Sequence, residues 1–90
     1  MAEIRVAKIK NTLGLHARAA AQFVQTANKF RAEVTVAKDG EEVNGKSILS
    51  LLMLDAPIGS EITIKAEGED AIEVVETLIE LIDNKFGEPK

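Results

Sequence analysis

The stretch Asn11-Thr-Leu-Gly-Leu-His-Ala-Arg18 joins a run with strand character, residues 3–10, to a run with helix character, residues 17–28. Its glycine marks a loop between the two elements. The stretch holds the only histidine of the chain, and Arg18 follows two residues later. The order of strand, glycine loop and helix therefore predicts that His16 lies at or next to a helix N-terminus.

The predicted position of His16 suits the binding of an anion. The first backbone N–H groups of a helix have no partner inside the helix, and the macrodipole adds partial positive charge there. A neutral imidazole beside an arginine and free amides can act as a nucleophile that accepts a phosphoryl group. The position leaves other roles open, because a lone histidine also serves as a cap, a surface residue or a core residue. Arg18 by itself is equally compatible with a solvated helix charge.

The composition is typical of a soluble globular protein, with 46% hydrophobic and 29% charged residues in a chain of 90. We expect a single domain over residues 1–90, and a monomer. The chain has no cysteine and one histidine, so neither a disulfide, a metal site nor a cofactor is expected. No apolar run approaches the length of a membrane span and no signal peptide is recognisable at the N-terminus, which favours the cytoplasm.

Charge is distributed unevenly along the chain. The net charge of −4 argues against nucleic acid as a partner. Residues 1–60 carry 8 basic and 6 acidic side chains, whereas residues 61–90 carry 3 basic and 9 acidic ones. The acidic half is read most simply as a solvated helix face. The alternative is that an acidic partner docks near His16 and is steered there by the opposite sign.

Hydrophobic periodicity predicts the remaining elements. They are strands at 33–38, 41–46 and 61–66 and helices at 47–54 and 71–86. In the first strand the register is open, because Ile4 and Val6 share one face while Ala7 and Ile9 share the other. The order β-α-β-β-α-β-α predicts an α+β fold with the helices on one face of an antiparallel sheet. A ferredoxin-like arrangement is the alternative.

Three turn and cap signals sharpen these boundaries. Asp39-Gly40 is the signal of a type I′ hairpin turn, because both residues tolerate positive φ. Asp70 is placed to cap the last helix. Gly87 is placed to end that helix, and the tail after it is expected to fray.

The short helix at 47–54 carries more apolar side chains than it can bury. Ser47 is in the right place to be its N-cap. We predict an exposed apolar patch near Leu49 and Leu52. Its functional interpretation is a docking surface, and the simpler one is an ordinary exposed residue or two.

The chain resembles the HPr family, the histidine phosphocarriers of the phosphoenolpyruvate:sugar phosphotransferase system. Four segments carry the resemblance: Gly14-Leu-His-Ala-Arg18, Ala20-Ala-Gln-Phe-Val24, Gly45-Lys-Ser-Ile48 and Ala66-Glu-Gly-Glu-Asp70. It extends over nearly the whole chain. It implies an HPr-like open-faced β-sandwich, with a four-stranded antiparallel sheet of order 1-4-2-3 and three helices on one face.

The resemblance also implies a function. Such proteins are carriers and not enzymes: they take a phosphoryl group from phosphorylated enzyme I, which is charged by phosphoenolpyruvate, and pass it to a histidine of an enzyme IIA protein or domain. His16 matches the accepting histidine, which reacts through Nδ1, and Arg18 matches the arginine beside the phosphate. Ser47 matches the serine that an HPr kinase/phosphorylase modifies in some bacteria.

Two departures from the family pattern keep alternatives open. Ala19 stands where the family motif usually has proline, which restores an N–H and loosens the helix start. The segment Leu51-Leu-Met-Leu-Asp55 looks closer to the nitrogen-related paralogue, which regulates instead of transporting sugar. Besides a phosphocarrier of the sugar or the nitrogen branch, the chain could be a regulatory binding protein controlled through Ser47 without phosphotransfer. Relatives of that kind lack the histidine. A ferredoxin-like interaction domain without chemistry would leave His16 and Arg18 unexplained.

Overall fold

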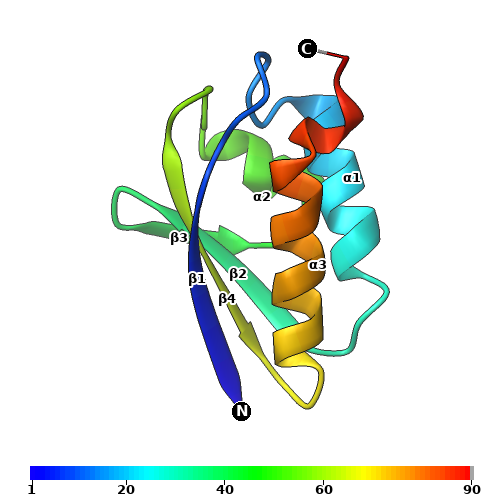
Figure 1. Cartoon of the computed structure of the whole chain (residues 1–90). Coiled ribbons are helices and arrows are strands. Elements are labelled where there is room, and N and C mark those ends of the chain that lie inside the picture. The colour runs from blue at the N-terminus through cyan, green and yellow to red at the C-terminus, as the bar shows by residue number, and fades with distance from the viewer. Residues whose placement is uncertain (90) are drawn as a thin grey trace.

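The computed structural model describes residues 1–89 and contains four strands, three helices and a short 3-10 turn (Figure 1). The elements in chain order are β1 (Ala2–Lys8), α1 (Ala17–Ala27), β2 (Glu33–Lys38), β3 (Glu41–Asn44), α2 (Ile48–Met53), β4 (Glu61–Glu67), α3 (Ala71–Asp83) and the 3-10 turn (Lys85–Gly87). The predicted order of elements is confirmed.

The strands form one antiparallel sheet with the order β1-β4-β2-β3. In Figure 1 the helices lie on one side of this sheet and leave its other side uncovered. The register places Ala7 opposite Ile62 and Val36 opposite Ile64, so that apolar side chains share the covered face. The predicted α+β class and the strand order implied by the resemblance are both confirmed.

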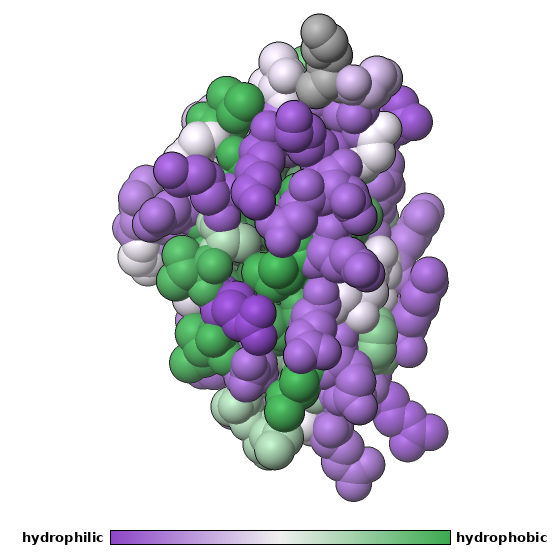
Figure 2. Space-filling view, in the orientation of Figure 1, coloured by the Kyte–Doolittle hydropathy of each residue, from purple (hydrophilic) through white to green (hydrophobic). Residues whose placement is uncertain are grey.

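The structure settles the register of β1. Ala7 and Ile9 are buried under the helices, whereas Ile4 and Val6 are 61% and 58% exposed on the open face. Figure 2 shows apolar side chains over β1 and hydrophilic ones over α3. The outer face of α3 carries four of the exposed acidic residues of the C-terminal half, in agreement with the predicted solvated helix face: Glu73, Glu76, Glu80 and Asp83.

The core lies between the sheet and the helices. Helix α1 buries Phe23 and Val24, and α3 buries Val75 and Leu78 against the same layer. Each such side chain contributes about 1.5–3 kcal/mol by leaving water. The packing therefore fixes the position and direction of α1, and with them the place of its N-terminus.

The hairpin between β2 and β3 has the predicted turn. Asp39 and Gly40 both have positive φ, at 53° and 85°. These values match a type I′ turn, whose twist suits two antiparallel strands.

The prediction that Asp70 caps α3 is confirmed for its position and not for a capping bond. Asp70 stands at the N-cap position of α3, but its side chain makes no capping bond there. Its carboxylate instead accepts from the backbone N–H groups of Arg31 and Ala32, at 2.9 and 2.8 Å. The Asp70 carboxylate therefore binds the backbone N–H groups just before β2 instead of the free N–H groups at the start of α3. These bonds, the one from Arg31 first, hold the pKa of Asp70 below its usual value.

The end of the chain also differs from the prediction. Helix α3 ends at Asp83 and not at residue 86, and Phe86 is buried in a left-handed conformation with φ 54°. Burial of this ring turns the chain back toward the start of α1, where Figure 1 shows the C-terminal end. Glu88 makes hydrogen bonds there, so the expectation of a frayed tail is wrong up to this residue. Lys90 lies outside the described residues.

Within residues 1–89 no helix combines the length and the apolar character needed to cross a membrane.

Candidate functional site

His16 is the N-cap residue of α1, as predicted. Its backbone is extended, with φ −87° and ψ −176°, and its carbonyl accepts the first helical hydrogen bond from Ala20 at 2.8 Å. Its side chain does not cap the helix, and it is 30% exposed. The imidazole is therefore accessible beside backbone amides that have no partner within the helix.

The two ring nitrogens of His16 face different groups. Nδ1 lies 3.1 Å from the carbonyl oxygen of Gly14, and Nε2 lies 3.9 Å from Oε2 of Glu88. A carbonyl oxygen only accepts hydrogen bonds, so in this arrangement a neutral ring carries its proton on Nδ1. The ring is thus held between a neutral acceptor and a carboxylate.

The loop that positions the Gly14 carbonyl needs a glycine at residue 14. Gly14 has φ 72°, a conformation that favours glycine. A Cβ atom here would lie 2.7 Å from the carbonyl oxygen of Ala56 and 2.9 Å from Cα of Pro57. The close backbone approach excludes a larger residue without movement of the loop.

Asn11 connects the loop to the tail. Its side chain is fully buried, and Nδ2 donates to the Gly14 carbonyl and to Oε2 of Glu88, both at 2.7 Å. Its Oδ1 is buried without a hydrogen-bond partner among the residues that the structure describes. Sequence reasoning did not single out Asn11. Its place before a glycine loop is a turn signal and nothing more specific.

Glu88 is the second site residue that the sequence did not reveal. Its side chain is only 12% exposed, and besides the bond from Asn11 it accepts a long contact of 3.5 Å from the Leu13 amide. The hydrogen bond from Asn11 is the main cause that lowers its pKa, and the Leu13 and Thr12 backbone and the charge of His16 act in the same direction. Glu88 is therefore an anion near neutrality. A glutamate beyond the last helix gives no sequence signal for such a role.

The side chain of Arg18 makes no hydrogen bond or ion pair with His16. It is exposed near the start of α1, and it makes no such bond with any other residue from 1 to 89. Its guanidinium is therefore free to turn toward an incoming anion. The following residue, Ala19, is fully buried and continues the helix.

The predicted cap and patch at α2 are both present. Ser47 is the N-cap, and its Oγ accepts from the Ser50 amide at 3.2 Å. Leu49 is 71% exposed, as predicted, whereas Leu52 is only partly exposed and packs against the core. Met53, at 68% exposed, is the residue that the prediction missed.

A shallow hollow of about 300 Å³ brings the His16 ring and α2 together. It is lined by Leu13, Leu15, His16, Leu52, Asp55, Ala56 and Pro57. The histidine thus lies on the same surface as the apolar residues of α2. In residues 1–89 no group of three or more histidine, cysteine or acidic side chains could hold a metal ion.

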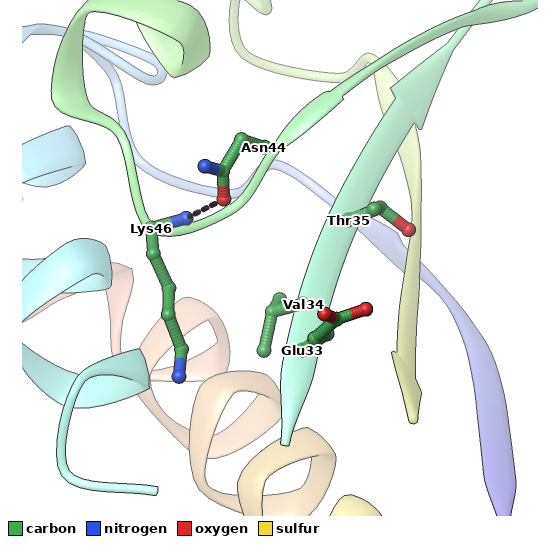
Figure 3. A pocket seen from close by; sticks show the side chains of 5 residues that line it. All are labelled: Glu33, Val34, Thr35, Asn44 and Lys46. Carbon is green, nitrogen blue, oxygen red and sulfur yellow. Dashed lines mark hydrogen bonds between the residues drawn. The ribbon is translucent and has the colours of Figure 1, made fainter. Parts of the chain in front are cut away.

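A second hollow, of about 420 Å³, lies at the β2–β3 edge and contains none of the predicted site residues (Figure 3). Lys46 lines it: its backbone N–H donates to Oδ1 of Asn44 at 2.9 Å, the bond drawn in Figure 3, and its Nζ donates to the Phe30 carbonyl at 2.8 Å. Both nitrogen atoms of Lys46 therefore have hydrogen-bond partners within the protein. These bonds fix the backbone just before Ser47.

Similarity to known proteins identifies the family of this chain. Residues 4–84 match the family model described as the PTS HPr component phosphorylation site. The chain belongs to the HPr family. It is therefore a relative of phosphocarrier proteins of the phosphotransferase system, which are not themselves enzymes.

Three relatives indicate how closely the chain follows other HPr proteins. It is 48% identical to phosphocarrier protein HPr of Neisseria meningitidis, over 90% of this chain and 91% of that protein. The crystal structure of HPr from Thermoanaerobacter tengcongensis is 44% identical and superposes with a TM-score of 0.94, covering 98% and 99% of the two chains. The crystal structure of Crh from Bacillus subtilis, described as a swapped dimer, is 42% identical, with a TM-score of 0.75 over 88% and 91%.

Proposed function

We propose that this HPr-family chain accepts a phosphoryl group on Nδ1 of His16 from phospho-enzyme I, charged by phosphoenolpyruvate, and passes it to a histidine of an enzyme IIA in sugar uptake. The observation that carries the proposal is an accessible imidazole at the N-terminus of α1. The lone pair of Nδ1 attacks phosphorus while the bond from phosphorus to the donor breaks, and the donor keeps that electron pair.

The surroundings of His16 suit a carrier. Phosphoryl transfer needs positioning and charge stabilisation more than covalent help from the protein. The first amides of α1 are placed to donate to phosphate oxygens, and an unengaged Arg18 adds a charge-assisted contact that can be released again. A shallow hollow holds the group loosely enough to give it up.

We assign partner docking to the apolar surface around Leu49 and Leu52. It adjoins His16 through the shared hollow, and Leu49 exposes a large apolar side chain. A phosphate on Ser47, added by an HPr kinase/phosphorylase, would stand at the start of α2 beside this surface and act by repelling a partner.

Two other functions have specific support. The segment 51–55 resembles the nitrogen-related paralogue, so a regulatory phosphocarrier of the nitrogen branch, with its own enzyme I and IIA, is the alternative to sugar uptake. The likeness to Crh, described as the catabolite repression HPr of Bacillus subtilis, supports a regulatory binding protein, which here would work through Ser47 and the α2 surface. The accessible His16 favours phosphotransfer instead. We further propose that the chain acts as a single-domain monomer in the cytoplasm. Sedimentation velocity tests the monomer, and a dimer would contradict it.

The decisive experiment is intact mass after incubation with phosphoenolpyruvate and enzyme I of either branch. We expect an acid-labile gain of one phosphate on the wild type and none on His16→Ala, which should still unfold cooperatively. Glu76→Gln, an exposed change on α3, is the control and should gain phosphate normally. No gain on the wild type with either enzyme I would refute the proposed function.

A further inference from the structure

The proposed reaction requires a lone pair on Nδ1 of His16, yet in the resting structure this nitrogen faces an acceptor. Nδ1 lies 3.1 Å from the Gly14 carbonyl, which places the proton of a neutral ring on Nδ1. Reaction at Nδ1 therefore needs the other tautomer, with the proton on Nε2. A group that accepts a hydrogen bond from Nε2 favours that tautomer and so raises the fraction of rings with a free lone pair on Nδ1.

The Gly14 carbonyl is a poor competitor for the ring proton. It already accepts from Asn11 Nδ2 at 2.7 Å and from the His16 backbone N–H at 2.9 Å. A carbonyl oxygen has two lone pairs, so Nδ1–H is the third donor to one acceptor. It is also the longest of the three contacts, at 3.1 Å. The bond that keeps the proton on Nδ1 is thus the weakest at this oxygen.

The group beside Nε2 is the Glu88 carboxylate, at 3.9 Å. The carboxylate accepts hydrogen bonds from Asn11 Nδ2 and from the Leu13 amide. The buried ring of Phe86 fixes the segment to which Glu88 belongs. An approach of about 1 Å would bring the carboxylate to the ~2.8 Å of a charge-assisted hydrogen bond. Such contacts are often long before the reaction complex forms and then tighten. A carboxylate retains accepting capacity after binding Asn11, because its two oxygens offer about four sites.

We propose that Glu88 is a positioning residue for phosphotransfer, whose carboxylate holds a proton on Nε2 of His16 and so leaves the reactive lone pair on Nδ1. The inference rests on the proposed function and names a residue that acts through the histidine. The switch of tautomer is neutral overall: the Nδ1 proton passes to water, and water returns one to Nε2.

The contact between Glu88 and Nε2 of His16 also assists the transfer of the phosphoryl group from His16 to the acceptor. With Nε2 protonated, the acceptor attacks phosphorus, the P–Nδ1 bond breaks, and its electron pair returns to Nδ1 of a neutral imidazole. Without that proton the leaving group would be an imidazolate anion, which is a much poorer leaving group. Glu88 therefore assists both acceptance and donation by keeping one proton in place.

The test compares wild type with Glu88→Gln, which keeps an acceptor for Asn11 but removes the charge, and with the matched control Glu76→Gln. Nitrogen-15 NMR of the His16 ring reports the tautomer ratio directly, which a merely structural role would not alter. We expect the ratio of Nε2–H to Nδ1–H to fall about tenfold in Glu88→Gln, from the difference between a charged and a neutral acceptor. The single-turnover rate at saturating phospho-enzyme I should fall by a similar factor, with no change in the control.

Each outcome decides the question. A tautomer ratio unchanged in Glu88→Gln overturns the inference, even if the rate falls, because Glu88 would then act only in docking. A wild-type rate in Glu88→Gln overturns it as well and leaves the proposed function standing. If the wild type gains no phosphate, the proposed function fails, and the NMR ratio still decides whether Glu88 sets the tautomer.

Discussion

Substitution of Gly14 by alanine should destabilise the protein through two separate terms. The first is conformational: φ 72° costs an alanine about 1–2 kcal/mol, partly offset by a stiffer unfolded chain. The second is steric, because the new Cβ would stand 2.7 Å from the carbonyl oxygen of Ala56 and 2.9 Å from Cα of Pro57. These are backbone atoms, which yield only if the loop moves, and relief of such overpacking costs about 1–3 kcal/mol. We expect a total loss of about 2–4 kcal/mol.

Gly40→Ala is the matched control, because Gly40 also has positive φ, 85°, but a Cβ there would meet nothing within 4 Å. It should lose only the conformational term, about 1 kcal/mol. Urea unfolding at 25 °C measures both variants by the same extrapolation. The difference between them isolates the close approach of the His16 loop to the Ala56–Pro57 segment. Equal losses, within about 0.5 kcal/mol, would refute the steric argument.

Two further predictions test the docking surface and the Asp70 contacts. Leu49→Lys should leave the unfolding free energy within about 0.5 kcal/mol of wild type, as for exposed sites, but lower phosphate uptake from enzyme I at limiting concentration. Val6→Lys, equally apolar and 58% exposed on the open face, should leave uptake unchanged, and a similar loss in both variants would count against a docking role for α2. Asp70→Asn should reduce stability at pH 7, because the pKa of Asp70 is lowered mainly by the Arg31 amide. This contribution to the free energy of unfolding is complete above pH 3.8, the pKa of Asp70 in the unfolded chain. It is lost as the pH falls through the lower pKa that Asp70 has in the folded protein. Urea titrations should therefore give the same stability for variant and wild type only in acid.

Periodicity predicted most of the fold because the relevant forces are local in the sequence. The alternation of Val34 and Val36 and the helical spacing of Phe23 and Val24 each specify one buried face, and the structure buries all four. The register of β1 was open for the same reason. With apolar residues on both faces, only the position of the helices decides that Ala7 goes inward.

The candidate site was predictable only in part, since some of it depends on contacts between distant segments. The positions of His16 and Ser47 at helix starts were predicted correctly, because a helix start can be recognised from nearby residues. The hydrogen bonds of the Asp70 side chain were not predicted, because the amides that donate them belong to a loop 38 and 39 residues away in sequence. Glu88 was missed because it follows a helix end and reaches Asn11 across 77 residues. No local pattern reports whether a tail returns to the body of a protein.

The histidine site is formed by two segments far apart in the sequence, the loop that begins at Asn11 and the C-terminal segment with Glu88. Asn11 donates at once to Gly14, which faces Nδ1, and to Glu88, which faces Nε2. One buried amide therefore sets the separation of the two acceptors between which the ring stands. A change at Asn11 would alter both sides of the imidazole together, whereas a change at Glu88 alters one. The balance between the two ring nitrogens is thus built into the loop and the tail, while the helix supplies the place where the phosphoryl group would be held.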